Sequence, residues 1–200
     1  MRTLQRVFPR AGVAIRHTEG FNPHAYISVA LPLSVGMESC CELLDFEVID
    51  DTPLETLPEW LTAKLPEGIR VLEAYEAPGK VKELVWLRLT GTLEYDKVAD
   101  TADMARKLDT FFARRPLFVT KLTKKKEETQ VDLGPMIREL KFTAETPYKV
   151  TLHAVVAAQN PSLNPSLLLE ALRQSAPELV PDFAAFSRVE VYDKNMQVFR

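Results

Sequence analysis

The chain has 200 residues, of which 46% are apolar and 26% are charged, and its formal net charge is −3. These values are ordinary for a folded globular protein and exclude a disordered chain or a polycation. No apolar run approaches the roughly 20 residues that span a bilayer, and the charged N-terminus lacks the apolar core of a signal peptide, so we expect a cytoplasmic protein without a membrane partner.

The charge is distributed unevenly along the chain. Residues 1–80 contain 7 basic and 12 acidic residues, whereas residues 81–200 contain 18 basic and 16 acidic residues. Because an anionic partner is attracted by local positive charge, we expect such a partner to contact the second half.

The two cysteines, Cys40 and Cys41, are neighbours in the sequence. Neighbouring side chains of a strand point to opposite faces, so a disulfide between them would be strained. Two cysteines without a histidine pair at ligand spacing do not form a zinc site. We therefore expect two small apolar side chains near a strand, no metal and no cofactor.

The first half is expected to contain two helices and several short strands. Leu4, Val7 and Phe8 recur at helical spacing, and Pro9 argues against a regular helix beyond it because proline has no N–H. A second helix is expected to begin at Pro53 and to end near Leu65. Strands are predicted at 13–17, 26–31, 42–49 and 69–77, and the two middle strands should pair as a hairpin.

We expect the linker between the halves at Pro78-Gly79-Lys80, where proline and glycine interrupt the pattern of apolar residues. Helices are predicted at 98–114 and 166–175 from apolar residues at helical spacing. Strands are predicted at 83–95, 117–122, 129–133, 148–158 and 186–192, with a short helical turn at 134–138.

This element order indicates the α+β class. The second half follows the β-α-β-β-α-β order of ferredoxin-like (split βαβ) units, and the first half matches it without the opening strand. We therefore expect two tandem ferredoxin-like halves, residues 1–79 and 80–200, of which the first is incomplete. The first strand is central in such a sheet, so its loss would leave a groove that a partner's strand or a second copy could fill.

The segment from His17 to Ser39 has the most unusual composition, and it contains a candidate ligand-binding site. The residues concerned are Gly20, Asn22, Pro23, His24 and Ser28. A loop fixed by glycine and proline can present an amide and an imidazole to a phosphate or a base. It can also place His24 as a general acid or base. The simpler alternative is a turn in which Asn22 and His24 bond backbone groups.

A cluster of cationic residues in the second half forms a candidate nucleic-acid-binding site. Its members are Arg114, Arg115, Lys121, Lys124, Lys125 and Lys126. Such a cluster binds phosphates by releasing counterions, although Glu127 and Glu128 offset part of the charge. The alternative is an ordinary solvated hairpin tip. Nearby, Asp132 is expected to pair with a lysine or to orient a ligand.

Residues 20–39, GFNPHAYISVALPLSVGMES, resemble the signature of an uncharacterised bacterial family whose members are encoded beside, or fused to, a B12-binding radical SAM protein. Weaker similarities follow at Lys124 to Leu133 and at Asn164 to Leu169. Family members usually begin with a strand and a Ser-His-Leu-Asp-Leu stretch before the position of Met1, and Pro9 also departs from the family pattern. The resemblance implies a radical SAM protein as partner and a setting related to RNA. The chain itself has no CxxxCxxC for an iron–sulfur cluster.

Three functional hypotheses are consistent with these patterns. The first is a non-catalytic module that binds RNA or presents a substrate to the radical SAM partner. The second is an RNA- or nucleotide-processing enzyme that uses His24. The third is an assembly subunit only, with a homodimer as one form of assembly.

Overall fold

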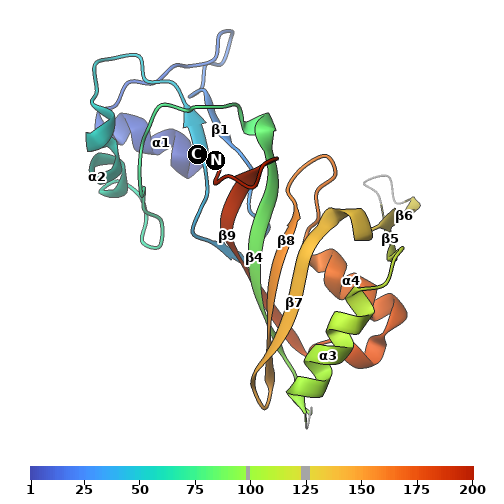
Figure 1. Cartoon of the computed structure of the whole chain (residues 1–200). Helices are drawn as coiled ribbons and strands as arrows, with labels where there is room; N and C mark the ends of the chain where they lie inside the picture. Colours follow the sequence, from blue (N-terminus) through green and yellow to red (C-terminus); the bar gives the residue numbers. More distant parts are fainter. Residues whose placement is uncertain (98–99, 123–126) are drawn as a thin grey trace. The chain divides into compact units, whose positions relative to one another are not determined.

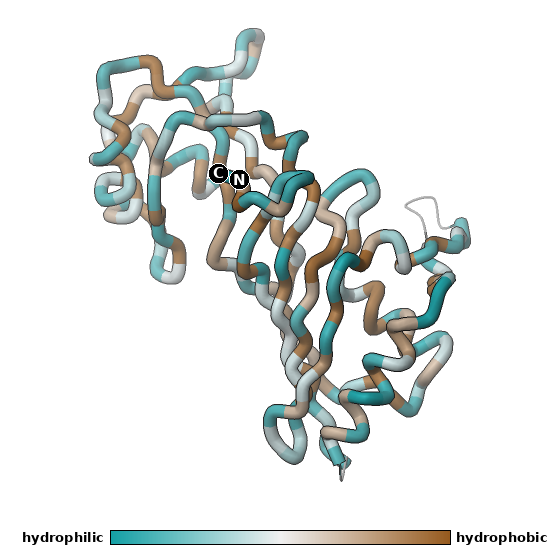
Figure 2. Tube along the Cα trace, in the orientation of Figure 1, coloured by the Kyte–Doolittle hydropathy of each residue, from teal (hydrophilic) through white to brown (hydrophobic). Residues whose placement is uncertain are grey.

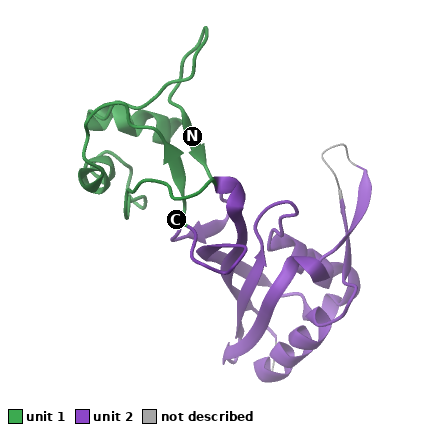
Figure 3. Cartoon of the chain, turned by 45° about the horizontal axis from the view of Figure 1, so that its top comes forward, with its two compact units in different colours: residues 1–32, 42–80, 200 green, residues 33–41, 81–199 purple. Residues whose placement is uncertain are grey.

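The computed structural model describes residues 1–97, 100–122 and 127–200. The chain divides into two compact units (Figure 3). Unit 1 contains Met1–Pro32, Glu42–Lys80 and Arg200, and unit 2 contains Leu33–Cys41 and Val81–Phe199. The chain therefore enters unit 2 briefly, returns to unit 1, and then completes unit 2.

Unit 1 begins with helix α1, Arg2–Ala11, which continues past Pro9. The expected interruption at Pro9 is wrong, since the helix continues for two residues beyond it. The proline removes only its own bond to the Gln5 carbonyl, while Val7 and Phe8 in the same part of the helix stay buried. Gly12 then ends the helix with a left-handed φ of 75°. The Gly12 N–H donates to the carbonyl of Pro9 at 3.3 Å and the Val13 N–H to that of Phe8 at 3.0 Å, the two bonds of a Schellman motif.

The strands of unit 1 are short. Strands β1, Ile27–Val29, and β3, Leu44–Phe46, pair antiparallel, which confirms the predicted hairpin pairing. Segment 13–17 takes part only through isolated bridges, and residues 69–77 form no strand. A 3-10 turn, η1 (Leu54–Thr56), leads into helix α2 (Leu57–Thr62).

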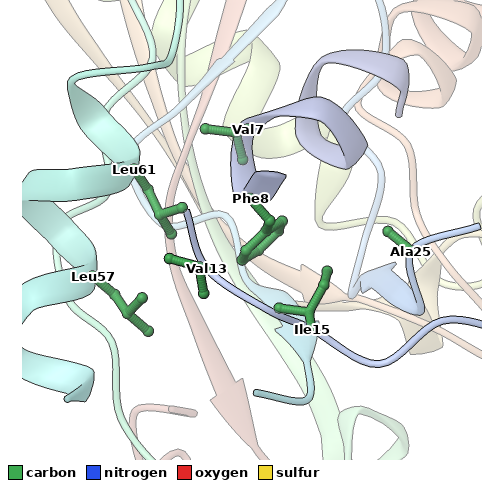
Figure 4. Close-up of a cluster of buried hydrophobic side chains, with 7 residues drawn as sticks. All are labelled: Val7, Phe8, Val13, Ile15, Ala25, Leu57 and Leu61. Atoms are coloured by element: carbon green, nitrogen blue, oxygen red, sulfur yellow. The ribbon is translucent and has the colours of Figure 1, made fainter. Parts of the chain in front are cut away.

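The core of unit 1 is one cluster of apolar side chains from α1, α2 and the segments around the strands (Figure 4). Its fully buried members are Val7, Phe8, Val13, Ile15, Ala25, Leu57 and Leu61. Ile15 and Ala25 belong to the two arms of the chain that lead into and out of the Gly20–His24 loop. The core thus fixes the base of that loop.

Unit 2 is built on a five-stranded sheet with the order β2-β9-β4-β8-β7 (Figure 1). The strands are β2 (Met37–Ser39), β4 (Leu84–Glu94), β7 (Ile137–Thr146), β8 (Lys149–Ala157) and β9 (Phe183–Asp193). Strand β2 runs parallel to β9, and the other neighbours are antiparallel. A 3-10 turn, η2 (Val81–Glu83), precedes β4.

Along the chain, the strands of this sheet and the two helices follow the order β4-α3-β7-β8-α4-β9, and β9, β4, β8 and β7 lie side by side in that order. This is the split βαβ arrangement. The predicted mixed α+β class is therefore confirmed. A tandem pair of such units is not confirmed, because β1 and β3 of unit 1 form a two-stranded sheet. Leu33–Cys41, which was expected within the first half, contributes β2 to the sheet of unit 2.

Helices α3, Thr101–Phe112, and α4, Ser166–Ser175, cover the same side of this sheet (Figure 1). The Asp100 side chain caps α3 by accepting a hydrogen bond from the Asp103 N–H at 3.0 Å. The expected start of this helix at Val98 lies outside the described residues. The buried side of α3 carries Met104, Ala105, Leu108, Phe111 and Phe112.

Strand β7 was not predicted, and the expected strands at 117–122 and 129–133 form a separate hairpin instead. This hairpin consists of β5 (Phe118–Leu122) and β6 (Glu128–Asp132). A 3-10 turn, η3 (Gly134–Met136), then leads into β7. Leu140 and Phe142 do alternate with charged residues in β7, but so few apolar residues give a weak signal because β7 is an edge strand with one polar side.

The exposed edge of β7 is covered by α3 through Asp109. The Asp109 carboxylate accepts a hydrogen bond from the Phe142 N–H at 3.0 Å and forms an ion pair with the Lys141 ammonium. This bond satisfies one backbone donor on the edge of β7, so that donor is not available to the strand of another chain. Asp109 therefore fixes α3 against this edge.

We expect Leu108→Ala to lower the free energy of unfolding of unit 2 by about 2–5 kcal/mol. Leu108 is fully buried between α3 and the sheet, so the change leaves a cavity. Thr110→Ala is the matched control, since Thr110 is exposed on the same helix and should change stability by no more than about 0.5 kcal/mol. Urea unfolding followed by circular dichroism measures both, and equal effects would contradict the described packing.

Candidate functional site

The predicted loop residues Gly20, Asn22, Pro23 and His24 lie together at the exposed tip of a hairpin in unit 1. The Thr18 N–H donates to the His24 carbonyl at 2.9 Å, and this bond closes the loop. Gly20 has a φ of 118°, a conformation that other residues rarely adopt. The loop is therefore fixed at its base and open to solvent at its tip.

The His24 ring is oriented by two neutral groups. Its Nδ1 lies 3.1 Å from Thr18 Oγ1 and 3.3 Å from the Asn22 carbonyl oxygen. A carbonyl can only accept, so we assign the hydrogen of the neutral ring to Nδ1, which leaves Nε2 as an acceptor. The His24 N–H also donates to Thr18 Oγ1 at 3.1 Å. The simpler expectation, a turn in which His24 bonds a backbone group, therefore describes part of this geometry.

Ser28 lies farther along the same hairpin, in β1, where it is exposed and pairs with Asp45. Tyr26 separates it from His24 in the sequence. The Arg16 guanidinium lies 5.1 Å from the centre of the Tyr26 ring and 3.0 Å from the Glu47 carboxylate. The sequence reasoning missed Thr18 and Arg16. Thr18 lies two residues before Gly20, and this position could have revealed it, because threonine side chains commonly bond nearby backbone groups.

The predicted cations Arg114 and Arg115 follow the last turn of α3 and differ in their contacts. Arg115 Nη1 donates to the carbonyls of Phe112 and Arg114, at 2.7 Å each, so it caps the helix end. A Cβ at Gly134 would lie 2.6 Å from Arg115 Cδ, which shows how tightly this side chain packs. The Arg114 guanidinium instead lies 5.0 Å from the Phe111 ring centre.

Two grooves run along α3, and each is lined by three cationic side chains. The groove between α3 and β7 has a volume of about 380 Å³ and is lined by Asp109, Phe112, Ala113, Arg115, Ile137, Arg138, Leu140 and Lys141. The groove between α3 and the 3-10 turn η4, Pro177–Leu179, has a volume of about 540 Å³. Its lining is Asp103, Arg106, Lys107, Thr110, Phe111, Arg114, Ser175, Ala176, Glu178 and Leu179.

Three of these six cations form ion pairs with the carboxylates of Asp103 and Asp109. Asp103 forms ion pairs with Lys107 at 2.7 Å and Arg106 at 3.1 Å, and these bonds hold the pKa of Asp103 below its usual value. Lys141 is paired with Asp109. The remaining three cations contact rings or carbonyls. Arg114 lies over Phe111, Arg138 over Trp86, and Arg115 bonds the helix end.

Lys121 is exposed on β5, in the hairpin that docks onto α4. The Thr120 N–H donates to Gln174 Oε1 at 2.9 Å, and Gln174 Nε2 donates to the Thr120 carbonyl at 2.7 Å. Lys124, Lys125 and Lys126 lie outside the described residues. The structure thus places Arg114 and Arg115 beside the α3 grooves and Lys121 on the neighbouring hairpin.

Among the described residues, Asp132 bonds backbone groups and not the expected lysine. Its Oδ1 accepts hydrogen bonds from the N–H groups of Leu117 and Gly134, both at 2.9 Å. It therefore holds together the base of the β5–β6 hairpin, next to Arg115. The cations Arg106, Lys107, Arg138 and Lys141 were also missed, although the i, i+3 and i, i+4 spacing of Asp103, Arg106 and Lys107 indicated a charged helix face.

The cysteines are free thiols, with Cys40 exposed and Cys41 half-buried. Burial raises the pKa of the Cys41 thiol to about 11, although a contact with Ser39 Oγ at 3.9 Å opposes the shift. A thiol is nucleophilic only as the thiolate, so Cys41 is poorly reactive near neutral pH.

Within residues 1–97, 100–122 and 127–200, no three or more His, Cys, Asp and Glu side chains gather closely enough to hold a metal ion. In the same described residues, every helix is too short or too polar to cross a membrane.

Fold and site together define a mixed α+β protein with a split βαβ unit whose first helix is flanked by cation-lined grooves. The chain belongs to a bacterial family described as "Uncharacterized protein conserved in bacteria (DUF2344)", whose model matches residues 1–165. A comparison with curated proteins gave no match. The membership confirms the resemblance to an uncharacterised bacterial family, and the radical SAM linkage stays a prediction.

We expect the two thiols to react at very different rates with a disulfide reagent. With a pKa of about 11, roughly one Cys41 thiol in a thousand is ionised at pH 8, whereas Cys40 is exposed. The Cys40→Ser protein should therefore react slowly, and its rate should rise about tenfold per pH unit from pH 8 to 10. Stopped-flow absorbance measures this, with Cys41→Ser as the control. Fast labelling of Cys40→Ser at pH 8 would contradict the burial of Cys41.

Proposed function

We propose that this protein is a non-catalytic RNA-binding module and that the cations around α3 contact the phosphates. The observation that supports the proposal is the pair of grooves along α3, each lined by three cationic side chains. The whole chain, including these cations, has a net charge of −3, so the concentration of cations around α3 is local. A local cationic surface is the electrostatic signature of a nucleic-acid-binding protein.

The contacts of these cations favour phosphate binding by some of them more than by others. Arg114 is exposed, and its guanidinium carbon lies 5.0 Å from the centre of the Phe111 ring. An arginine guanidinium binds a phosphate with two parallel hydrogen bonds. Lys121 is exposed on the neighbouring hairpin and adds a further positive charge. Arg115 bonds the end of α3, so we assign it a structural role before any contact with RNA.

The geometry of the hairpin loop in unit 1 supports binding more than acid–base catalysis. The His24 ring is held by a hydroxyl and a carbonyl, and the hydrogen bonds that orient it within the described residues include no second acid or base. The ring nevertheless presents Nε2 as an acceptor beside the exposed Asn22. The loop could therefore accept a hydrogen bond from a base or a ribose hydroxyl.

We expect tight RNA binding at low salt that Arg114→Ala/Lys121→Ala weakens for all RNA sequences alike. Each phosphate contact to single-stranded RNA contributes about 0.7 to the slope of log Kobs against log salt, so the double variant should make this slope shallower by about 1.4. Filter binding between low and moderate salt measures both quantities. Lys124/Lys125/Lys126→Ala tests the other predicted cations in the same assay.

The matched control is Arg70→Ala, which removes one exposed positive charge from unit 1. It should leave both affinity and slope almost unchanged. The proposal fails if the unaltered protein does not bind RNA at low salt, or if Arg70→Ala weakens binding as much per charge as the double variant does. Arg115→Ala is unsuitable as a probe because it also removes the cap of α3.

A second candidate function, docking to a protein partner, is favoured by the apolar residues exposed on unit 1. Trp60 on α2 is 43% exposed, and Ile69 and Leu72 in the segment that follows α2 are 48% and 63% exposed. Val71 and Ala74 of that segment pack against the core, so Leu72 projects outward between them. Large apolar side chains exposed close together in the sequence are typical of a protein-binding surface. The radical SAM protein implied by the resemblance is the partner we propose.

We expect Leu72→Asp to abolish co-purification of the chain with the radical SAM protein that the family resemblance implies, while the affinity for RNA stays intact. A charge placed at an apolar contact loses its hydration on docking, which opposes binding. Val35→Asp is the control, since Val35 is a fully exposed apolar residue of unit 2. Equal co-purification of all three proteins would rule out this surface, and an unaltered chain that does not co-purify would rule out the partner.

A further inference from the structure

The sheet of unit 2 has a second side, opposite the helices. Along β4, hydrophobic and hydrophilic residues alternate (Figure 2). Leu87, Leu89 and Leu93 are buried on the side that faces α3 and α4, so the residues between them point to the other side. Through the strand register, the outward residues of β4 lie beside those of β8 and β9, and they define what we call the outer face. Its central members are Trp86, Arg88, Thr90, His153, Val155, Ala157, Ser187, Glu190 and Tyr192.

Two arginines of this outer face lie over aromatic rings. The Arg88 guanidinium carbon is 5.6 Å from the centre of the Tyr192 ring. The guanidinium carbon of Arg138, from β7, is 5.6 Å from the centre of the Trp86 ring on β4. Strand β8 lies between β7 and β4, so the Arg138 side chain must cross it.

The residues of β8 beneath this crossing are small and buried. Ala157 pairs with Trp86 in the register, and Val155 pairs with Arg88. They are only 8% and 2% exposed, although both belong to the outward side of their strand. Small side chains at these positions let a long arginine lie flat on the sheet. The outer face thus contains two arginines whose guanidinium groups lie over aromatic rings.

The rings hold the two guanidinium groups in place. Both Arg88 and Arg138 are exposed, Trp86 is half-buried, and Tyr192 is buried. A cation over an aromatic ring is attracted by the negative face of the ring, which restricts the side chain before any ligand binds. Since both arginine side chains are exposed, their guanidinium groups remain accessible to a flat ligand.

We propose that the outer face binds an unpaired segment of RNA whose bases stack on the guanidinium planes of Arg88 and Arg138. This inference rests on the proposed RNA-binding function and names the form of RNA that is bound. Nucleobases in single strands stack on aromatic rings and on arginine planes, whereas the bases of a duplex are already stacked inside the helix. The exposed His153 and the neighbouring Thr90 supply hydrogen-bonding groups on the same face.

The charged side chains on this face are of both signs. Arg88 and Arg138 are cationic, Glu139 and Glu190 lie on the same side through the register, and Lys141 is held in an ion pair with Asp109. Glu190 lies opposite Arg88, and its Oε1 accepts a hydrogen bond from the Val191 N–H at 3.0 Å. That carboxylate is therefore held against the strand. The arginines can pair with phosphates while they stack with bases.

The first experiment uses the fluorescence of Trp86. The protein contains two tryptophans, so Trp60→Phe leaves Trp86 as the reporter. A single-stranded 12-nucleotide RNA should quench this fluorescence, and a duplex RNA of equal length should bind more weakly and quench less. Quenching by both RNAs to the same extent and at the same concentration would overturn the proposal.

The second experiment separates stacking from charge. Arg88→Lys/Arg138→Lys keeps both charges but removes both guanidinium planes, and it should weaken single-strand binding about 5-fold or more with an unchanged salt slope. Arg70→Lys/Arg173→Lys makes the same chemical change at two exposed arginines that line neither α3 groove and do not belong to the outer face, and it is the matched control, with an expected change of less than about twofold. Thermal unfolding of each variant verifies that the sheet is intact.

The outcomes distinguish this inference from the proposed function. If Arg88→Lys/Arg138→Lys binds single strands normally while Arg114→Ala/Lys121→Ala weakens binding, the outer face is not the stacking surface and the RNA-binding function stands. If the unaltered protein binds no RNA, both proposals fail. If the Arg→Lys change affects only co-purification with a protein, the outer face is a protein-binding surface and this inference is wrong.

Discussion

Burial of one side of the unit 2 sheet against α3 and α4 is the constraint on which the rest of this unit depends. Leu87, Leu89 and Leu93 of β4 must leave water, and the apolar side of α3 covers them. Each buried leucine contributes roughly 1.5–3 kcal/mol of transfer free energy. Because strand side chains alternate, the same packing directs Trp86 and Arg88 to the opposite side. One hydrophobic contact thus separates a helical side from an outer face.

The position of α3 also determines where its cations lie. Asp109 bonds the edge of β7, and Phe111 and Phe112 are buried, so the helix cannot rotate without losing both sets of contacts. Charged residues of α3 and of its C-terminal end, such as Arg106, Lys107 and Arg114, are consequently held beside the grooves. Arg115 illustrates the cost of this arrangement, because it must satisfy the carbonyls at the end of the helix. A cation that is bound in this way stabilises the site more than it recognises a ligand.

The two units differ in how much regular structure supports them. Unit 2 has strands of up to 11 residues that are paired along their length. Unit 1 relies on one apolar cluster around Phe8, with strands of three residues each. Apolar side chains such as Leu72 are also exposed there. A small unit with a limited core is commonly completed by contacts with another molecule, which agrees with the proposed partner surface on unit 1.

The sequence by itself determined the α+β class, the helices α3 and α4, the long strand β4 and the β1–β3 pairing. These features depend on periodic apolar residues and on local turns, which can be recognised in the sequence. It also identified Arg114, Arg115 and the Gly20–His24 loop as unusual. It did not reveal β7, whose apolar signal is weak at a sheet edge, or the parallel pairing of β2 with β9. Only the tertiary structure brought Arg138 over Trp86 and Arg88 over Tyr192. Those residues are far apart in the sequence. The register of β4 and β9 brings Arg88 close to Tyr192, and the Arg138 side chain reaches Trp86 across β8.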